Sequence, residues 1–136
     1  PNLPETATLL GEPEPSDWAG MIRLADLWKA RFSTALLLKG GHLGGGDSPD
    51  LLAISTDQHR FDATRIETRN THGTGCTLSA AIAALLPQRP DLRSAVAAAK
   101  RYLTGAIAAS DQLSVGHGHG PVHHFHQLWQ TEERFS

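Results

Sequence analysis

The chain has 136 residues, of which 40% are hydrophobic and 19% are charged, and its formal net charge at pH 7 is −2. This composition supports a domain with a real hydrophobic core, excludes a disordered chain, and shows no basic excess that would point to nucleic acid. The longest apolar runs, such as Leu78–Leu86, are about half as long as a membrane-spanning helix. The single cysteine excludes an internal disulfide and predicts a reducing, cytoplasmic compartment.

The first third of the chain predicts two helices followed by a strand. A short helix is expected from Pro4 to Leu10. A side-chain oxygen of Ser16 or Asp17 is placed to cap a second helix from about Trp18 to Phe32, whose apolar residues recur at i, i+3 and i+4 spacings. The continuous apolar run Ala35–Leu38, closed by glycines, predicts a strand that is buried on both faces.

The next segments predict a loop, a hairpin and two long helices. Residues 41–50 are rich in glycine and are expected to form the loop, with Leu51–Thr56 and Arg60–Thr68 as the strands of the hairpin. The apolar run Gly73–Leu86 predicts a buried helix, and Asp91 is placed to cap the second helix. The stripe that this second helix is expected to bury consists of Leu92, Val96, Ala99, Leu103 and Ile107. This order of elements predicts an α/β fold with helices against a sheet.

The segment NTHGTGCTLS, residues 70–79, places two glycines and the only cysteine at the start of a predicted helix. The first turn of a helix has backbone N–H groups without partners and a positive dipole end, and glycines let an anion approach them. A cysteine there has its thiolate stabilised, which suits a base or a nucleophile. The segment predicts a phosphate or oxyanion site beside Cys76. The alternative is that Gly73 and Gly75 only permit a tight turn and that Cys76 is a small buried hydrophobe.

Five short motifs are more specific together, in chain order, than any one of them alone. They are PNLPE at residues 1–5, LLLKGGHL at 36–43, NTHGTGCTLSAAIAA at 70–84, AKRY at 99–102 and GHGHGPVHHF at 116–125. In this combination the chain resembles the hydroxymethylpyrimidine/phosphomethylpyrimidine kinases of thiamine biosynthesis, which belong to the ribokinase-like superfamily. The resemblance implies the C-terminal part of a three-layer α/β/α sandwich, as a single domain over residues 1–136. It implies a transferase that uses ATP to phosphorylate 4-amino-5-hydroxymethyl-2-methylpyrimidine and then its monophosphate.

The resemblance also implies roles for the residues around the cysteine. The anion hole, whose amides stabilise the transferring phosphoryl group, would be formed by the turn Gly73-Thr74-Gly75-Cys76. Cys76 would stand where most ribokinase-like enzymes carry an aspartate base and would take the proton from the substrate hydroxyl, although a covalent role is also open. Thr71 and His72 precede the anion hole, where they would meet a phosphate or hold the loop in shape.

Two further motifs would handle the nucleotide. Asn2 would support the phosphates, and Glu5 would hold Mg²⁺ through water. The alternative for this pair is a simple helix start, with the charge of Glu5 in the first turn. Lys39 ends the predicted strand, where it can reach a phosphate or face solvent. Residues 40–42 would form a loop beside the nucleotide.

The tail has two interpretations. Five histidines fall within residues 117–126, which suggests a transition-metal site because imidazole is a common ligand. The GHGHGP part belongs to the resemblance, and its glycines indicate instead that the backbone approaches a nucleotide or a sheet edge closely. His124 stands where the resemblance leads us to expect an asparagine, and His123 could be the shifted equivalent.

By resemblance, the chain begins in the middle of the kinase. Pro1 is not an initiator methionine, so we expect the N-terminal half, with most of the pyrimidine pocket, to be absent. We therefore expect little kinase activity from the chain alone, and a homo-oligomer or a complex with the missing half. The expected ligand is a small-molecule pyrimidine, with no nucleic acid or membrane partner. The alternatives are a fragment of a pyridoxal-type vitamin kinase and a non-catalytic assembly or metal-binding remnant.

Overall fold

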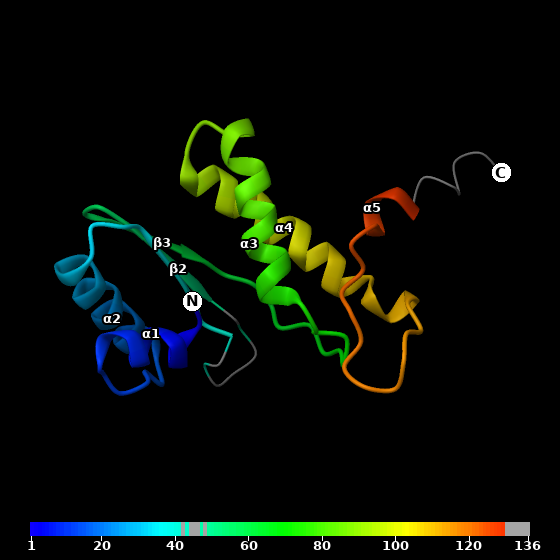
Figure 1. The fold of residues 1–136 in the computed structure, drawn as a ribbon, viewed down its shortest axis with the longest axis horizontal. Helices are drawn as coiled ribbons and strands as arrows, with labels where there is room; N and C mark the ends of the chain where they lie inside the picture. The colour runs from blue at the N-terminus through cyan, green and yellow to red at the C-terminus, as the bar shows by residue number, and fades with distance from the viewer. Residues whose placement is uncertain (42, 44–46, 48, 130–136) are drawn as a thin grey trace. The chain divides into compact units, whose positions relative to one another are not determined.

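The computed structural model describes residues 1–41, 43, 47 and 49–129, and the chain divides into two units, Pro1–Arg65 and Ile66–Ser136 (Figure 1). The first unit contains α1 (Leu3–Leu10), α2 (Trp18–Arg31), β1 (Leu36–Lys39), β2 (Asp50–Ile54) and β3 (Asp57–Phe61). The second contains α3 (Thr74–Leu85), η1 (Leu86–Gln88), α4 (Leu92–Ala108), η2 (Ser110–Gln112) and α5 (His126–Trp129).

Both helices of the first unit begin at side-chain caps. The Asn2 side chain accepts a hydrogen bond from the Glu5 amide at 2.8 Å, and the Glu5 carboxylate accepts one from the Asn2 amide at 2.8 Å, which together form a capping box. Asp17 caps α2 by accepting a hydrogen bond from the Gly20 amide at 2.8 Å. Gly11 ends α1 in the left-handed conformation. The predicted bounds of both helices are confirmed to within one residue.

The three strands form an antiparallel sheet in the order β1-β2-β3. Register places Leu36 opposite Ala53 and Leu38 opposite Leu51, so these four side chains share one face. That face packs against α1 and α2 to form the core of the unit. The remaining buried members of this core are Leu3, Met21, Leu24, Ala25 and Leu43.

The strand predictions are wrong in part. The first strand begins at Leu36, and its burial alternates rather than extending to both faces, because β1 turns every second side chain towards the two helices. The second strand of the hairpin is Asp57–Phe61 and not Arg60–Thr68. Only residues 55 and 56 separate the paired strands, and Ser55 takes a φ of 49°. The two turn residues, Ser55 and Thr56, include no glycine or asparagine, which are the residues typical of a two-residue hairpin turn, so the sequence does not mark the turn at this position.

The second unit is built on the pairing of α3 with α4. Asp91 caps α4 as predicted, by accepting a hydrogen bond from the Ser94 amide at 2.6 Å. The segment after η2 returns along α4, where the Tyr102 hydroxyl donates a hydrogen bond to the His124 carbonyl at 2.9 Å. The His123 amide donates to the Ala106 carbonyl at 2.9 Å, so the tail is attached to α4 at two points.

Two burial predictions for these helices need correction. Within α3 only Thr77 and Leu78 are buried, so the prediction of a wholly buried helix is wrong. The reason is that, among the described elements, it is mainly α4 that packs against α3. In α4 the buried residues are Ala95, Val96, Ala98, Ala99 and Ala106. Leu92, Leu103 and Ile107 of the predicted stripe are only half-buried, because small alanines fill the faces that α4 turns inward.

Of the described residues, none belongs to a helix that has both the length and the apolar content needed to cross a membrane.

Candidate functional site

The turn before α3 has the geometry of an anion site. Gly73 is the N-cap residue of α3, with a φ of 81°, and no side chain caps the helix there. Within the described part of the chain, the Gly75 and Cys76 amides have no hydrogen-bond acceptor. These amides belong to the first turn, where the helix dipole is positive, so an incoming anion could accept hydrogen bonds from both.

Cys76 lies at this turn and is exposed to solvent. The alternative that it is a small buried hydrophobe is therefore wrong, because Thr77 and Leu78 take the buried positions of this turn of α3. Thr71 and His72 are also exposed, and residues 73–75 are half-buried. The turn thus presents a thiol, a hydroxyl and uncapped amides on one short segment of chain.

A network of hydrogen bonds holds this turn to the segment after α4. The side-chain amide of Asn70 donates to the Ser110 carbonyl at 3.0 Å and to the Asp111 carboxylate at 3.2 Å. The Thr68 hydroxyl donates a hydrogen bond to the same carboxylate at 2.8 Å and accepts one from the backbone amide of Asn70 at 3.1 Å. This network fixes the backbone immediately before the anion-binding turn.

The same turn is also attached to the glycine- and histidine-rich tail. The His72 amide donates to the Gly120 carbonyl at 3.1 Å, and His72 forms a parallel bridge with Pro121. A Cβ atom at Gly120 would overlap the side-chain oxygen of Asn70. The close approach of backbone that the tail glycines indicated is therefore made to the turn at Asn70 and His72.

The tail histidines do not converge on one point in the structure. His123 and His126 are buried, whereas His117, His119 and His124 are exposed. The His123 ring meets the Trp129 ring edge-on at 4.3 Å between centroids. Among the residues that the structure describes, no group of three or more His, Cys, Asp or Glu side chains could hold a metal ion.

The predicted nucleotide-handling residues of the first unit lie close together. Asn2 forms a parallel bridge with Lys39, whose amide donates to the Pro1 carbonyl at 3.0 Å. The charges of Lys39, Glu5 and Asp50 all act on the backbone nitrogen of Pro1, so these three side chains are electrostatic neighbours at the start of α1. Of the predicted loop at 40–42, His42 lies outside the described residues.

The family model for phosphomethylpyrimidine kinase matches residues 1–123, which is most of the chain. The chain belongs to the phosphomethylpyrimidine kinase family. This match confirms the resemblance inferred from the five motifs. The Cys76 thiol and the uncapped amides before α3 therefore belong to a member of this kinase family.

Two curated relatives from the phosphomethylpyrimidine kinases are similar to this chain over nearly the whole length of the chain. Both are named hydroxymethylpyrimidine/phosphomethylpyrimidine kinase: the protein of Escherichia coli is 50% identical over 95% of the chain, and that of Rhizobium meliloti is 51% identical over 96%. The chain covers 48% and 49% of these relatives, so it spans about half the length of the proteins that it matches.

A solved structure supports the fold. The ADP complex of Bacillus subtilis pyridoxal kinase matches with a TM-score of 0.85 and 31% identity, over 95% of this chain and 50% of that one. The predicted ribokinase-like α/β fold is thereby confirmed.

The predicted site residues fall into two groups, each within one unit. Asn2, Glu5 and Lys39 belong to the first unit, and the turn from Thr71 to Cys76 belongs to the second. Sequence reasoning missed the Asn70 network, because its partners Ser110 and Asp111 are 40 and 41 residues away and carry no recognisable spacing. The bond that the tail glycine Gly120 makes was signalled only by its place in the GHGHGP motif.

Proposed function

We propose that this chain is the phosphate-handling part of an ATP-dependent kinase that phosphorylates 4-amino-5-hydroxymethyl-2-methylpyrimidine and then its monophosphate. The observation that carries the proposal is the exposed Cys76 thiol beside two uncapped amides at the start of α3, in a member of the phosphomethylpyrimidine kinase family. The names of the curated relatives support the choice of substrate. We propose that residues 1–136 act as one domain in this role.

The turn would act on the substrate hydroxyl and on the transferring phosphoryl group. Cys76, as a thiolate, accepts the proton of the substrate hydroxyl, and the freed oxygen forms a bond to the γ-phosphorus of ATP. The bond between that phosphorus and the bridging oxygen of the β-phosphate breaks, and ADP leaves with the bonding electrons. The Gly75 and Cys76 amides donate hydrogen bonds to the oxygens of the transferring group, on which negative charge is spread. Gly73, Thr74 and Thr71 shape this turn.

The first unit would bind the nucleotide and its metal. Glu5 is one carboxylate, held in a capping box with Asn2, and no group of three His, Cys, Asp or Glu side chains among the described residues could coordinate an ion alone. This donor set fits Mg²⁺ carried on nucleotide phosphates, because Mg²⁺ keeps several waters and uses one or two protein carboxylates. When bound, the ion neutralises phosphate charge. Lys39, beside Asn2, would add a positive charge towards the phosphates.

Pyridoxal is the second candidate substrate, because the solved structure with a TM-score of 0.85 is a pyridoxal kinase. The higher identity to the pyrimidine kinases, 50% against 31%, favours the pyrimidine. Both substrates present a hydroxymethyl group on a planar aromatic ring, so the same turn could act on either.

The test is a kinase assay on the purified chain, alone and mixed with the part of the E. coli relative that the chain does not match. We expect the mixture to phosphorylate the hydroxymethylpyrimidine and its monophosphate, with ADP release as the readout, and to use pyridoxal poorly. Cys76→Ser in the mixture should lower kcat by about 10²-fold or more, as expected for loss of a positioned base. Cys76→Asp should retain much of the activity, because a carboxylate can take the same proton.

Three results would change the proposal. If the Cys76→Ser mixture keeps full activity, Cys76 is not the base. If pyridoxal is the better substrate by kcat/KM, the hypothesis of a pyridoxal kinase replaces the hypothesis of a pyrimidine kinase. If a mixture in which the two parts bind each other phosphorylates neither compound, the chain is a non-catalytic assembly partner.

A further inference from the structure

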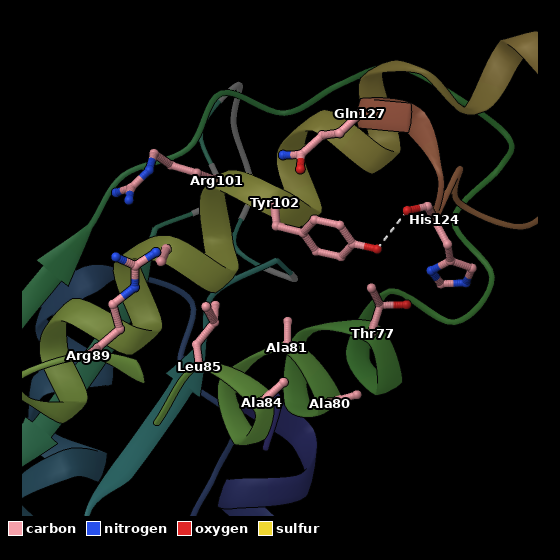
Figure 2. A pocket seen from close by; sticks show the side chains of 11 residues that line it. Thr77, Ala80, Ala81, Ala84, Leu85, Arg89, Arg101, Tyr102, His124 and Gln127 are labelled. Atoms are coloured by element: carbon pink, nitrogen blue, oxygen red, sulfur yellow. Dashed lines mark hydrogen bonds between the residues drawn. The ribbon is translucent and has the colours of Figure 1, made fainter. Parts of the chain in front are cut away.

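A pocket of about 780 Å³ lies along α3 and α4 in the second unit and begins at Thr77, the residue after Cys76 (Figure 2). Cys76, Gly73 and Gly75 do not line it. Its volume falls in the range of small-molecule sites, which span about 300–1,000 Å³. Neither the proposed reaction nor the residues assigned to it use this pocket.

The floor of the pocket is apolar. Three alanines of α3 (Ala80, Ala81 and Ala84) project into it in Figure 2, opposite the ring of Tyr102 on α4. The Tyr102 hydroxyl donates to the His124 carbonyl at 2.9 Å, which fixes the ring in place. A flat or slender apolar group would fit between the alanine side chains and this ring.

One side of the pocket is positively charged. Arg89 follows η1 and Arg101 lies on α4, and in Figure 2 both guanidinium groups lie on the side away from the Tyr102 hydroxyl. Neither arginine has an ion pair or hydrogen bond among the described residues. No Asp or Glu lines the pocket. Two guanidinium groups without a protein counter-charge are suited to bind a carboxylate or a phosphate.

We propose that this pocket binds a small organic anion: a planar or slender apolar body that carries one carboxylate, sulfonate or phosphate group. The apolar body lies between the alanines of α3 and the Tyr102 ring, and the anionic group accepts hydrogen bonds from Arg89 and Arg101. The pocket adjoins the phosphate-handling turn at Thr77, but the inference uses none of the residues assigned to the proposed function.

The first experiment compares two dyes of the same shape and different charge on the full chain. The anionic dye is 8-anilinonaphthalene-1-sulfonate, and the uncharged one is N-phenyl-1-naphthylamine. We expect the combined substitution Arg89→Gln and Arg101→Gln to raise the Kd of the anionic dye by at least about tenfold, since two charge-assisted hydrogen bonds are lost. The Kd of the neutral dye should stay within about twofold, because the apolar floor is unchanged.

Two matched controls separate the pocket from other surfaces of the chain. Arg93 is an exposed arginine of α4 that does not line the pocket, so Arg93→Gln should leave both dyes unaffected. Ala84→Trp should exclude both dyes, whereas the same change at Ala83, an exposed residue of α3 outside the pocket, should exclude neither. Circular dichroism of each variant checks that α3 and α4 remain folded.

Competition identifies the anionic group and tests the independence of the site. Phenyl phosphate and benzoate are added to the dye complex, and the better competitor identifies the preferred group. Equal loss of both dyes in the arginine variant, or no effect of that variant on either dye, would overturn the proposal. Displacement of the dye by ATP, in mutually exclusive binding, would also overturn it, because the pocket would then belong to the nucleotide site.

Discussion

At the scale of single residues, Gly73 is the position on which the shape of the anion-binding turn depends. Its φ of 81° is left-handed, and a Cβ atom there would meet no other atom within 4 Å. The constraint is therefore on the backbone and not on space. A residue with a side chain would have to take a conformation that is unfavourable by about 1–2 kcal/mol.

We predict that Gly73→Ala lowers the free energy of unfolding by about 1–2 kcal/mol, as measured by urea denaturation. Gly118 is the matched control, because a Cβ atom there also meets open space and its backbone is not left-handed. Gly118→Ala should change the stability by less than about 0.5 kcal/mol. Equal effects of the two substitutions would contradict a backbone origin.

The exposed thiol allows the anion site to be tested without any assay of activity. We predict that iodoacetamide modifies Cys76 in the folded chain, and mass spectrometry reads this directly because the chain has one cysteine. Inorganic tripolyphosphate at a concentration near its Kd should slow the modification by about twofold, since it would occupy the neighbouring amides. Sodium chloride of equal ionic strength is the control. Equal rates in the two salts would show that the turn holds no polyphosphate.

At the scale of elements, the segment before α3 and the tail after α4 depend on one contact. The Asn70 side chain donates to Ser110 and Asp111, while its oxygen occupies the space where a Cβ atom of Gly120 would lie. Asn70→Ala should therefore cost about 1–3 kcal/mol of stability through the lost hydrogen bonds.

We predict that Gly120→Ala is destabilising in the natural sequence and much less so when Asn70 is already alanine. The reason is that the shortened side chain no longer overlaps the new Cβ atom. Urea denaturation of the four chains should give a coupling of about 0.5–3 kcal/mol. Additive effects would mean that the two residues do not share this contact.

The hairpin of the first unit carries a second element-scale prediction. Ser55 is the described non-glycine residue with a positive φ, 49°, in a two-residue turn between Ile54 and Asp57. Ser55→Gly should raise the stability by up to about 1 kcal/mol, because glycine adopts this conformation without strain. Thr56→Gly at the neighbouring position should lower it. A thermal midpoint that falls with Ser55→Gly would contradict this explanation.

At the scale of the whole molecule, the second unit exposes large apolar side chains near α5. Phe125, Leu128 and Trp129 are 62%, 66% and 54% exposed. Apolar groups left in water favour association, so we predict that the chain elutes from size exclusion, with light scattering, above its mass of 14.6 kDa. Leu128→Ser combined with Trp129→Ser should shift it towards the monomer. A strictly monomeric chain at high concentration would contradict the expected homo-oligomer.

Local patterns in the sequence predicted the helices well. Asp17 and Asp91 are short oxygen side chains before periodic apolar residues, and both are caps in the structure. Capping involves residues two or three positions apart, so its signal lies within a short window of sequence. The same locality explains why the turn before α3 could be predicted as an uncapped, glycine-bounded helix start.

Predictions that depended on what surrounds an element were weaker. The apolar composition of α3 indicated full burial, yet only Thr77 and Leu78 are buried. Composition reports what a side chain prefers, whereas burial depends on which other elements pack against it. The hairpin turn at Ser55 was missed for a related reason, because pairing of β2 with β3 holds a serine in a conformation that its own preference does not favour.

The sequence by itself determined the family, the helix starts and the glycine-cysteine turn, since each is encoded in residues that are adjacent or nearly so. Only the tertiary structure decided that Cys76 is exposed, that Asn70 bonds to Ser110 and Asp111, and that Arg89 and Arg101 line one pocket. The residues paired in this way, Asn70 with Asp111 and Arg89 with Arg101, are 41 and 12 positions apart. Chain folding brings them together without leaving a pattern in the sequence.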